Sequence, residues 1–375
     1  MLKNKLYGTA ALVLSVALSQ GAMAELKGTN VDKALKKGQE YMVLTNYPNN
    51  LQIIDLKTET VYKRCEMPGK YGPGQVQMSP DKSRAYILTN SFKEIYGVNV
   101  DTCKLEFRAR FAQEPGEVAS SMFSMAVSAD GKEVYTITNP TIKYADHYRV
   151  QTPRLQVYST ADGVNAKAIR TFPAPRQMYV MQAADDGSLY AAGPDFYKVD
   201  VNTGEFEVAI PLRNWGREGY GAPDVLYFWP HQQHTRDFSI LYAAPKYAED
   251  GVTEEDFIYG FINVNLKTGK TERVDFASLS EVYFTGMRHP FEPNKMYGVL
   301  NNLNVYDIEN KKQIKSKSLD HTYYNINFNV RGDKIYLAGT LNDVSVHDAK
   351  TLKKVNSIKL EGGDQAITTA QIFIR

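Results

Sequence analysis

Short apolar runs alternating with polar turns recur along most of this chain. The clearest unit spans residues 75–111, where four alternating or apolar segments are separated by turns at 80–83 and 101–102. Pro80 and Asp81 are typical of tight turns, because proline presets φ and aspartate bonds to nearby backbone. Four β-strands in so short a segment form a meander that leaves its faces unburied. We therefore expect copies of the unit to pack on either side of it.

The strand–turn–strand pattern recurs in the same order along the chain. Its second strand is found as YMVLTN from Tyr41, AYILTN from Ala85, VYTITN from Val134, LYAAG from Leu189, LYAAP from Leu241, MYGVLNN from Met296 and IYLAG from Ile335. A spacing of roughly 40 to 55 residues with four strands per copy is typical of β-propeller blades. The alternative, a two-domain β protein with irregular sandwiches, would not keep this order.

The pattern predicts an all-β protein, a seven-bladed β-propeller that forms a single domain over residues 25–375. The first blade, residues 40–67, lacks an innermost strand, and AITTAQIFIR at residues 366–375 supplies one. The C-terminal strand is thus expected to close the ring by completing the first blade, which removes free sheet edges. The other blades are expected at residues 75–111, 124–172, 178–212, 225–276, 281–319 and 323–360.

Two insertions, residues 141–154 and 246–256, are expected between the second and third strands of their blades. They fall on the face that also carries the blade-to-blade connections, which we call the top face. Long loops gathered on one face are where propellers usually bind. In the connecting loop 213–224, Trp215 and Tyr220 are expected to be exposed, because this loop is glycine-rich and polar. Packing between blades is the alternative for every top-face aromatic, namely Tyr71, Trp215, Tyr220, Tyr283, Phe284, Tyr323 and Tyr324.

The first 24 residues are interpreted as a cleavable secretory signal peptide. Lys3 and Lys5 precede an apolar run, and Ala22-Met23-Ala24 forms a small-x-small cleavage site. The apolar run is too short for a membrane anchor. Cleavage would leave 42 basic and 42 acidic residues. Such a neutral, mixed surface argues against nucleic acid or an anionic membrane as the partner.

Cys65 and Cys103 are the only cysteines of the chain. In an exported protein such a pair is more often bridged than free. Both are expected near the outer strands of blades one and two. Their positions are offset along the blades, however, and a disulfide needs Cα atoms within about 7 Å. A disulfide is favoured, with two free thiols as the alternative.

Motifs for catalysis or cofactor binding are absent from the sequence. It has no CxxCH, no GxGxxG after a strand, no Walker sequence and no HExxH. His231 and His234 form an HxxH on a turn, which we interpret as a pair of surface residues. The expected innermost strands carry Met, aromatic and small residues rather than the acidic, Asn or His groups of a propeller hydrolase. We predict no catalytic residue, no metal site and no cofactor bound by this chain.

Residues 41–90, which begin YMVLTNYPNNLQIID and end QVQMSPDKSRAYILTN, together with PRLQVYST and GGDQAITTAQIFIR, resemble the β subunit of quinohemoprotein amine dehydrogenase. The YxxTN and SPD elements are shared with a wider class of YVTN-type propellers. The resemblance covers essentially the whole mature chain and implies a periplasmic heterotrimer. Its partners would be a dihaem cytochrome c α subunit and a small γ subunit carrying cysteine tryptophylquinone.

The resemblance also implies an activity, the oxidative deamination of primary amines to aldehyde and ammonia. This chain would hold both partners and wall off the active site, with Tyr71, Trp215, Tyr220, Tyr323 and Tyr324 as candidates for the pocket wall or the docking surface. Two other functions stay open from the residues themselves. They are a stand-alone exported binding propeller and a propeller hydrolase or lactonase.

Overall fold

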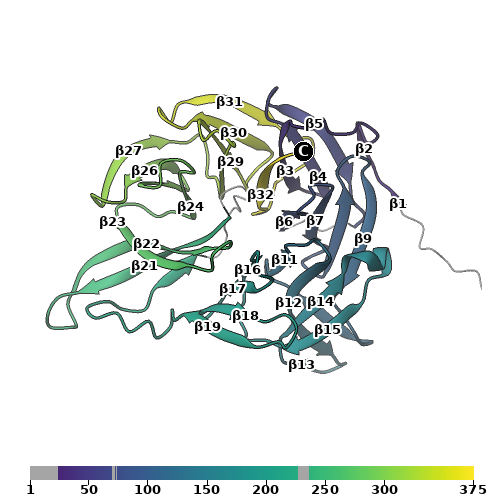
Figure 1. Ribbon diagram of the computed structural model, residues 1–375, viewed down its shortest axis with the longest axis horizontal. Coiled ribbons are helices and arrows are strands. Elements are labelled where there is room, and N and C mark those ends of the chain that lie inside the picture. Colours follow the sequence, from purple (N-terminus) through teal and green to yellow (C-terminus); the bar gives the residue numbers. More distant parts are fainter. Residues whose placement is uncertain (1–23, 70–71, 73, 227–235) are drawn as a thin grey trace, which may run out of the picture.

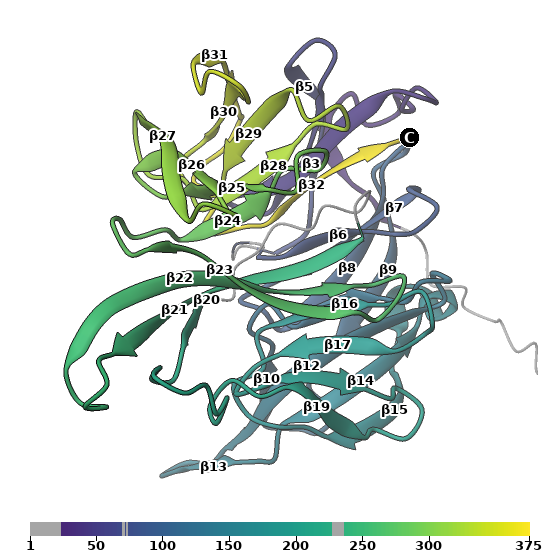
Figure 2. The same ribbon diagram turned by 60° about the vertical axis from the view of Figure 1, so that its left-hand side comes forward.

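The computed structural model describes residues 24–69, 72, 74–226 and 236–375. These residues form seven antiparallel sheets that stand around one axis as the blades of a β-propeller (Figures 1 and 2). The predicted fold class is confirmed. The predicted signal peptide lies almost wholly outside the described residues. In the part of the chain that is described, no helix is long and apolar enough to cross a membrane.

Blades one and two contain both ends of the described chain. From the axis outward, blade one contains β32 (Ala370–Ile374), β3 (Glu40–Asn46), β4 (Asn50–Asp55), β5 (Thr60–Glu66) and β2 (Lys27–Thr29). Blade two contains β6 (Val76–Met78), β7 (Arg84–Thr89), β8 (Glu94–Asn99), β9 (Lys104–Arg110) and β1 (Ala24–Glu25). The N-terminal strands β1 and β2 thus cover the outer edges of the two blades.

The next two blades follow the same order. Blade three contains β11 (Met125–Val127), β12 (Glu133–Lys143), β14 (Arg154–Ser159), the 3-10 helix η1 (Thr160–Asn165) and β15 (Ala168–Pro173), with β10 (Glu117–Ser120) and β13 (Tyr148–Val150) paired to the upper half of β12. Blade four contains β16 (Val180–Ala183), β17 (Leu189–Ala192), β18 (Phe196–Val199) and β19 (Phe206–Ile210).

The last three blades complete the ring. Blade five contains β20 (Asp224–Leu226), β21 (Asp237–Tyr247), β22 (Glu254–Asn265) and β23 (Thr271–Ser278). Blade six contains β24 (Thr285–Arg288), β25 (Lys295–Val299), β26 (Asn302–Asp307) and β27 (Lys312–Ser318). Blade seven contains β28 (Asn325–Phe328), β29 (Lys334–Ala338), β30 (Asp343–Asp348) and β31 (Lys354–Lys359).

Both insertions that were expected as loops are β-structure instead. Residues 246–256 extend the β21–β22 hairpin, which reaches far out from the ring in both views (Figures 1 and 2). Residues 141–150 continue β12 and return as β13. Backbone groups in long connections need partners, and pairing the two arms of an insertion supplies them within the insertion itself. The insertions therefore add paired β-strands, rather than irregular loops, to the top face.

The hydrophobic core lies between neighbouring blades. Ile53 of blade one and Val98 of blade two belong to one buried cluster, and Leu44 of blade one and Val344 of blade seven belong to another. Each blade thus buries both faces against its neighbours, which explains why a single meander could not stand alone. Closure by β32 is confirmed, since it pairs antiparallel with β3 along its full length.

Cys65 and Cys103 form a disulfide that links blades one and two, with Cα atoms 5.5 Å apart. The offset seen in the sequence is removed by the twist of the blades, which brings each outer strand toward the third-to-fourth strand turn of the next blade. Hydrogen bonds occupy the same position at other junctions. Examples are Arg108 with Ala166 (3.1 Å) and Asn356 with Glu59 (2.8 Å). The disulfide is a covalent form of this repeated contact.

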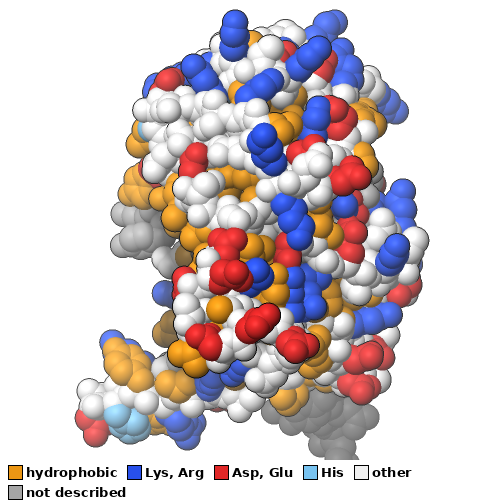
Figure 3. All heavy atoms as spheres, turned by 90° about the vertical axis from the view of Figure 1, so that its left-hand side faces the viewer, with side chains coloured by type: hydrophobic (Ala, Val, Ile, Leu, Met, Phe, Trp, Pro, Cys, Tyr) orange, Lys and Arg blue, Asp and Glu red, His pale blue; other side chains and the backbone are white. Residues whose placement is uncertain are grey.

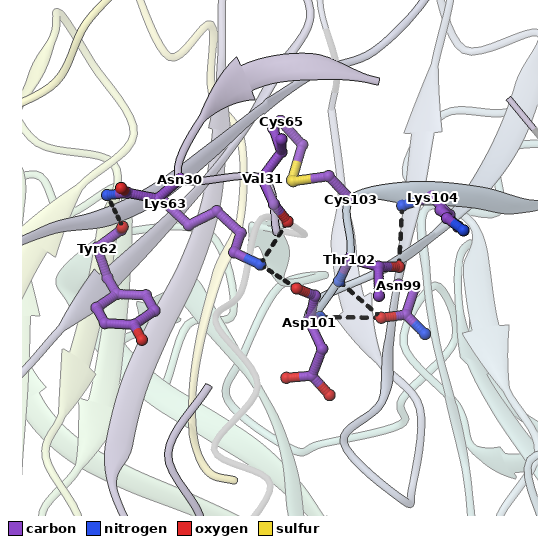
Figure 4. The surroundings of a disulfide bond; sticks show 10 residues. All are labelled: Asn30, Val31, Tyr62, Lys63, Cys65, Asn99, Asp101, Thr102, Cys103 and Lys104. Carbon is purple, nitrogen blue, oxygen red and sulfur yellow. Dashed lines mark hydrogen bonds between the residues drawn. A yellow bond between two sulfur atoms is a disulfide. The ribbon is translucent and has the colours of Figure 1, made fainter. Parts of the chain in front are cut away.

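A fully buried lysine lies beside the disulfide (Figure 4). The Lys63 ammonium donates to the backbone carbonyls of Val31 (3.1 Å) and Asp101. Burial lowers the pKa of Lys63 to about 8, and the neighbouring Asp101 charge only partly opposes this effect. Lys63 thus ties the N-terminal segment to the turn that carries Cys103.

Because of the lowered pKa of Lys63, we expect the stability of the protein to rise with pH. The unfolded chain holds the lysine proton up to about pH 10.4, whereas the folded chain releases it near pH 8. Between these values the unfolded state binds more protons, so the free energy of unfolding should rise by about 1–2 kcal/mol from pH 8 to 9.5. Urea unfolding at both pH values measures it. Lys63→Met should lose most of this rise, and the exposed Lys57→Met should keep it. An equal rise in all three proteins would contradict the assignment.

Candidate functional site on the top face

Amide side chains on the innermost strands tie neighbouring blades together around the axis. Gln75 donates to the Met125 carbonyl and accepts from the Met125 amide, at 3.1 Å each. Gln77, Gln371 and Asn327 also bond to backbone of the adjacent blade. The sequence interpretation of these strands as Met, aromatic and small residues missed this ladder. The sequence did contain a signal for this ladder, namely the alternation of amide and apolar residues in QVQ and NINFN. Every second residue of a strand faces the same side, so the amides share one face.

The described residues hold no group of three or more His, Cys, Asp or Glu side chains that could bind a metal. His289 and His347 are buried, which lowers the pKa of each ring. His289 contacts the Gly332 carbonyl (2.9 Å) and His347 the Leu352 carbonyl (3.0 Å), so both act in the local packing. His231 and His234 lie outside the described residues.

The loop at 213–224 folds back onto blade five instead of standing free on the top face. Trp215 is only 8% exposed and packs edge-on against Tyr242, with ring centroids 5.5 Å apart, while Tyr220 is half-buried. Gly216 and Gly219 have positive φ values, which let this loop reverse its direction. The expectation that Trp215 is exposed is therefore wrong. Glycine content indicated a turning loop but not where the loop would pack.

Arg217 holds this loop against the outer strand of blade five. Its guanidinium makes a two-pronged ion pair with the Asp275 carboxylate, and the Tyr242 hydroxyl donates to the same carboxylate. Burial opposes ionisation of Asp275, but the bonds from Arg217 and Tyr242 prevail and hold its pKa below the usual value. The guanidinium also lies 3.5 Å from the centre of the Tyr220 ring. The Arg217 guanidinium thus binds the loop to blade five through the ion pair, and it also contacts a ring within the loop.

The remaining candidate aromatics do not gather into one pocket. Tyr323 is fully buried and its hydroxyl donates to Asp343 (3.0 Å), and burial raises the pKa of this tyrosine. Tyr324 is half-buried and packs on Phe284, with ring centroids 4.2 Å apart. Tyr71 lies outside the described residues. The described candidates are therefore split between blades five and seven, and their docking role stays a prediction.

Exposed apolar side chains do gather on the top rim of blades seven and one. Leu341, in the turn between β29 and β30, is 50% exposed, and Ile367, which precedes β32, is 36% exposed. Tyr47 is exposed as well. Asp364 joins the segments, because its carbonyl accepts the Tyr47 amide (2.8 Å) and its carboxylate the Leu341 amide (2.7 Å). We call Tyr47, Leu341 and Ile367 the rim patch.

Two residues of the rim patch have a left-handed backbone. The φ angles are 49° at Leu341 and 67° at Ile367. A β-branched residue in this region is a rare and unfavourable conformation. Strained residues with exposed apolar side chains are more typical of binding surfaces than of parts that only stabilise a fold. Sequence reasoning missed them because a left-handed isoleucine has no sequence signature, and 366–375 was expected to be strand throughout.

A second exposed apolar surface stands on blade three. There β12 runs beyond the blade and pairs with β10 and β13, which gives a three-stranded arm (Figure 2; lower left in Figure 3). Val118, Tyr148 and Val150 are exposed on this arm. This surface was not predicted from the sequence, because a loop was expected at residues 141–154. A loop prediction does not say which side chains share a face. We call β10, β13 and residues 139–143 of β12, with which they pair, the arm.

Comparison with known proteins identifies the fold. No family model and no curated protein matches the sequence. Among solved structures, the chain is similar to the dihydro-heme d1 dehydrogenase NirN in complex with DHE, with 12% identity over 91% of this chain and 76% of that chain and a TM-score of 0.51. It is similar to hydrazine synthase of Kuenenia stuttgartiensis (12%; 85% and 97%; 0.52). It is also similar to a functionally unknown protein from Desulfotomaculum acetoxidans (13%; 89% and 98%; 0.54). The chain is a seven-bladed β-propeller, and the likeness shows that its fold is shared with these proteins.

Proposed function

We propose that this chain is the propeller subunit of a periplasmic amine dehydrogenase of the quinohemoprotein type. It would dock a dihaem cytochrome c subunit and a small subunit carrying cysteine tryptophylquinone, and it would wall off the site where primary amines are oxidised. The haem and quinone would belong to those partners. The sequence resemblance over the mature chain supports this reading, as does the secretory signal predicted at residues 1–24.

The observation that carries the proposal is the rim patch. Leu341 and Ile367 expose apolar side chains from a strained backbone, and neither belongs to a buried core cluster. Asp364 fixes the segments that carry Tyr47 and Leu341. A rigid, apolar surface that costs stability is what a permanent partner would retain. Two structures with this fold are named as redox-related enzymes, a dehydrogenase and hydrazine synthase, so the fold occurs in that setting.

Purification of the native protein from its host tests the function. We expect haem absorbance and a small quinone-staining band to co-purify with this chain from the periplasmic fraction, and the complex to oxidise primary amines. Activity of the single chain would instead identify a stand-alone enzyme such as a hydrolase or lactonase. A protein that carries neither partner nor activity would be a binding propeller.

The rim patch can be tested with the substitution Leu341→Asn. Asparagine tolerates a left-handed backbone better than leucine does, so the melting temperature should stay the same or rise. Loss of the apolar side chain should weaken assembly with the partner subunits about tenfold or more. Val355→Thr on β31 of the same blade, where Val355 is 53% exposed, is the control and should assemble normally. Unchanged assembly of Leu341→Asn in titrations of the purified subunits would remove the rim patch from the interface.

A further inference from the structure

The arm has one face packed on the body of the propeller and one face in solvent. Its register places Val118 opposite Thr141 and Thr141 opposite Val150. Directly paired residues point to the same side of a sheet, and so does Tyr148, two residues before Val150. Tyr148 and Val150 are 67% and 62% exposed, whereas Ile142 on the other face is buried. The arm therefore presents three exposed apolar side chains beside Lys143 on one face, which nothing in the described chain covers.

The outer edge of the arm is β13, whose backbone pairs with β12 on one side only. The Gln151 amide donates to the Pro140 carbonyl at 3.0 Å, directly after β13. Hydrogen-bonded positions alternate along an antiparallel ladder, so Arg149 also directs its backbone groups into the arm. The backbone N–H and C=O groups of Tyr148 and Val150 then point toward the open edge. They are placed to bond a further strand.

This edge lacks the protection that several other outer edges of the propeller have. The strands β1 and β2 cover the edges of blades two and one. Outer strands β27 and β31 carry lysines, a common defence against strand addition, at Lys312, Lys315, Lys317, Lys354 and Lys359. By contrast, β13 reads Tyr-Arg-Val and has neither lysine nor proline. An exposed edge that no strand covers, with two apolar residues and no lysine or proline, is suited to pairing with another chain.

We propose that a partner subunit of the complex adds a β-strand to β13. This inference rests on the proposed function and names how one partner would bind. The added segment would place apolar residues beside Tyr148 and Val150 and an acidic residue beside Arg149. A second copy of this chain fits less well, because antiparallel pairing of two β13 strands about a two-fold axis sets two Arg149 side chains opposite each other.

The test uses Val150→Pro in the full chain, expressed with the partner subunits of its host complex. Proline removes only the outward N–H group at this position and leaves the bonds between β12 and β13 intact. The melting temperature of the isolated chain should stay within a few degrees of wild type, and affinity for the partner should fall at least tenfold. Val150→Thr keeps the N–H group and should lose much less. Amide hydrogen exchange on the wild-type complex should show new protection at Tyr148 and Val150.

The outcomes separate this inference from the proposed function. If the wild-type chain assembles with no haem-bearing or quinone-bearing subunit, the proposed function fails. If it assembles and Val150→Pro assembles equally well, without new protection on β13, strand addition alone is overturned. Equal losses in Val150→Pro and Val150→Thr would show side-chain docking instead of backbone pairing. A wild-type homodimer in sedimentation that Val150→Pro abolishes would make the second copy the occupant and would also overturn the proposal.

Discussion

Deletion of residues 366–375 should abolish soluble folding of this protein. The strand β32 in this segment is the innermost strand of blade one and pairs with β3 from Glu40 to Leu44. Without it, β3 would have an unpaired edge at the axis. Exposed edges of this kind favour aggregation. Removal of these ten residues should therefore destabilise the whole propeller and lower its solubility, not only disrupt blade one.

Two blade junctions would be lost together with this strand. Thr369 accepts from the Val76 amide (2.9 Å) and Gln371 from the Met78 amide (2.8 Å), and these bonds link the strand to blade two. Ile372, which is buried, also belongs to the core shared with blade seven. Burial of such a side chain contributes about 1.5–3 kcal/mol. Several such losses approach the whole stability of an ordinary domain, about 5–15 kcal/mol.

Soluble yield and a circular dichroism melt measure the effect of this deletion. A chain that lacks residues 27–29 is the control, because β2 covers only an outer edge with exposed residues and its removal should leave a cooperative melt. A truncated protein without residues 366–375 that still melts cooperatively near the full-length temperature would show that the ring does not depend on this strand.

The substitution Trp215→Ala should lower the free energy of unfolding by about 3–5 kcal/mol. Trp215 is buried in the largest apolar cluster of blades four to six, where it packs against Tyr242. Its removal would leave a cavity and loosen the loop that Arg217 ties to Asp275. Removing a buried aromatic ring costs both its transfer free energy and the contacts of the residues around it.

Urea unfolding of the isolated chain measures this loss. Tyr47→Ala is the matched control, since Tyr47 is an exposed aromatic residue and its removal should change stability by no more than about 0.5 kcal/mol. The two variants should thus behave in opposite ways, with Trp215→Ala impairing the fold and Tyr47→Ala impairing assembly. A Trp215→Ala protein of wild-type stability that fails to assemble would restore Trp215 as a docking anchor.

The sequence by itself determined the architecture. Each blade is a local meander whose strands alternate with period two and whose turns contain residues such as Pro80 and Asp81, so blade limits can be found without knowledge of distant contacts. Counting the strands of the first repeat also predicted its partner at residues 366–375. That inference succeeded because an incomplete blade must find its missing strand somewhere in the chain.

Only the tertiary structure decided which surfaces are exposed. The burial of Trp215 depends on how a loop folds back onto a blade, and the approach of Cys65 to Cys103 depends on the accumulated twist of two sheets. The exposure of Leu341 and Val150 depends on what their neighbours leave uncovered. These properties arise from contacts between residues far apart in sequence, whereas hydrophobic alternation reports only which side of its own strand a residue faces.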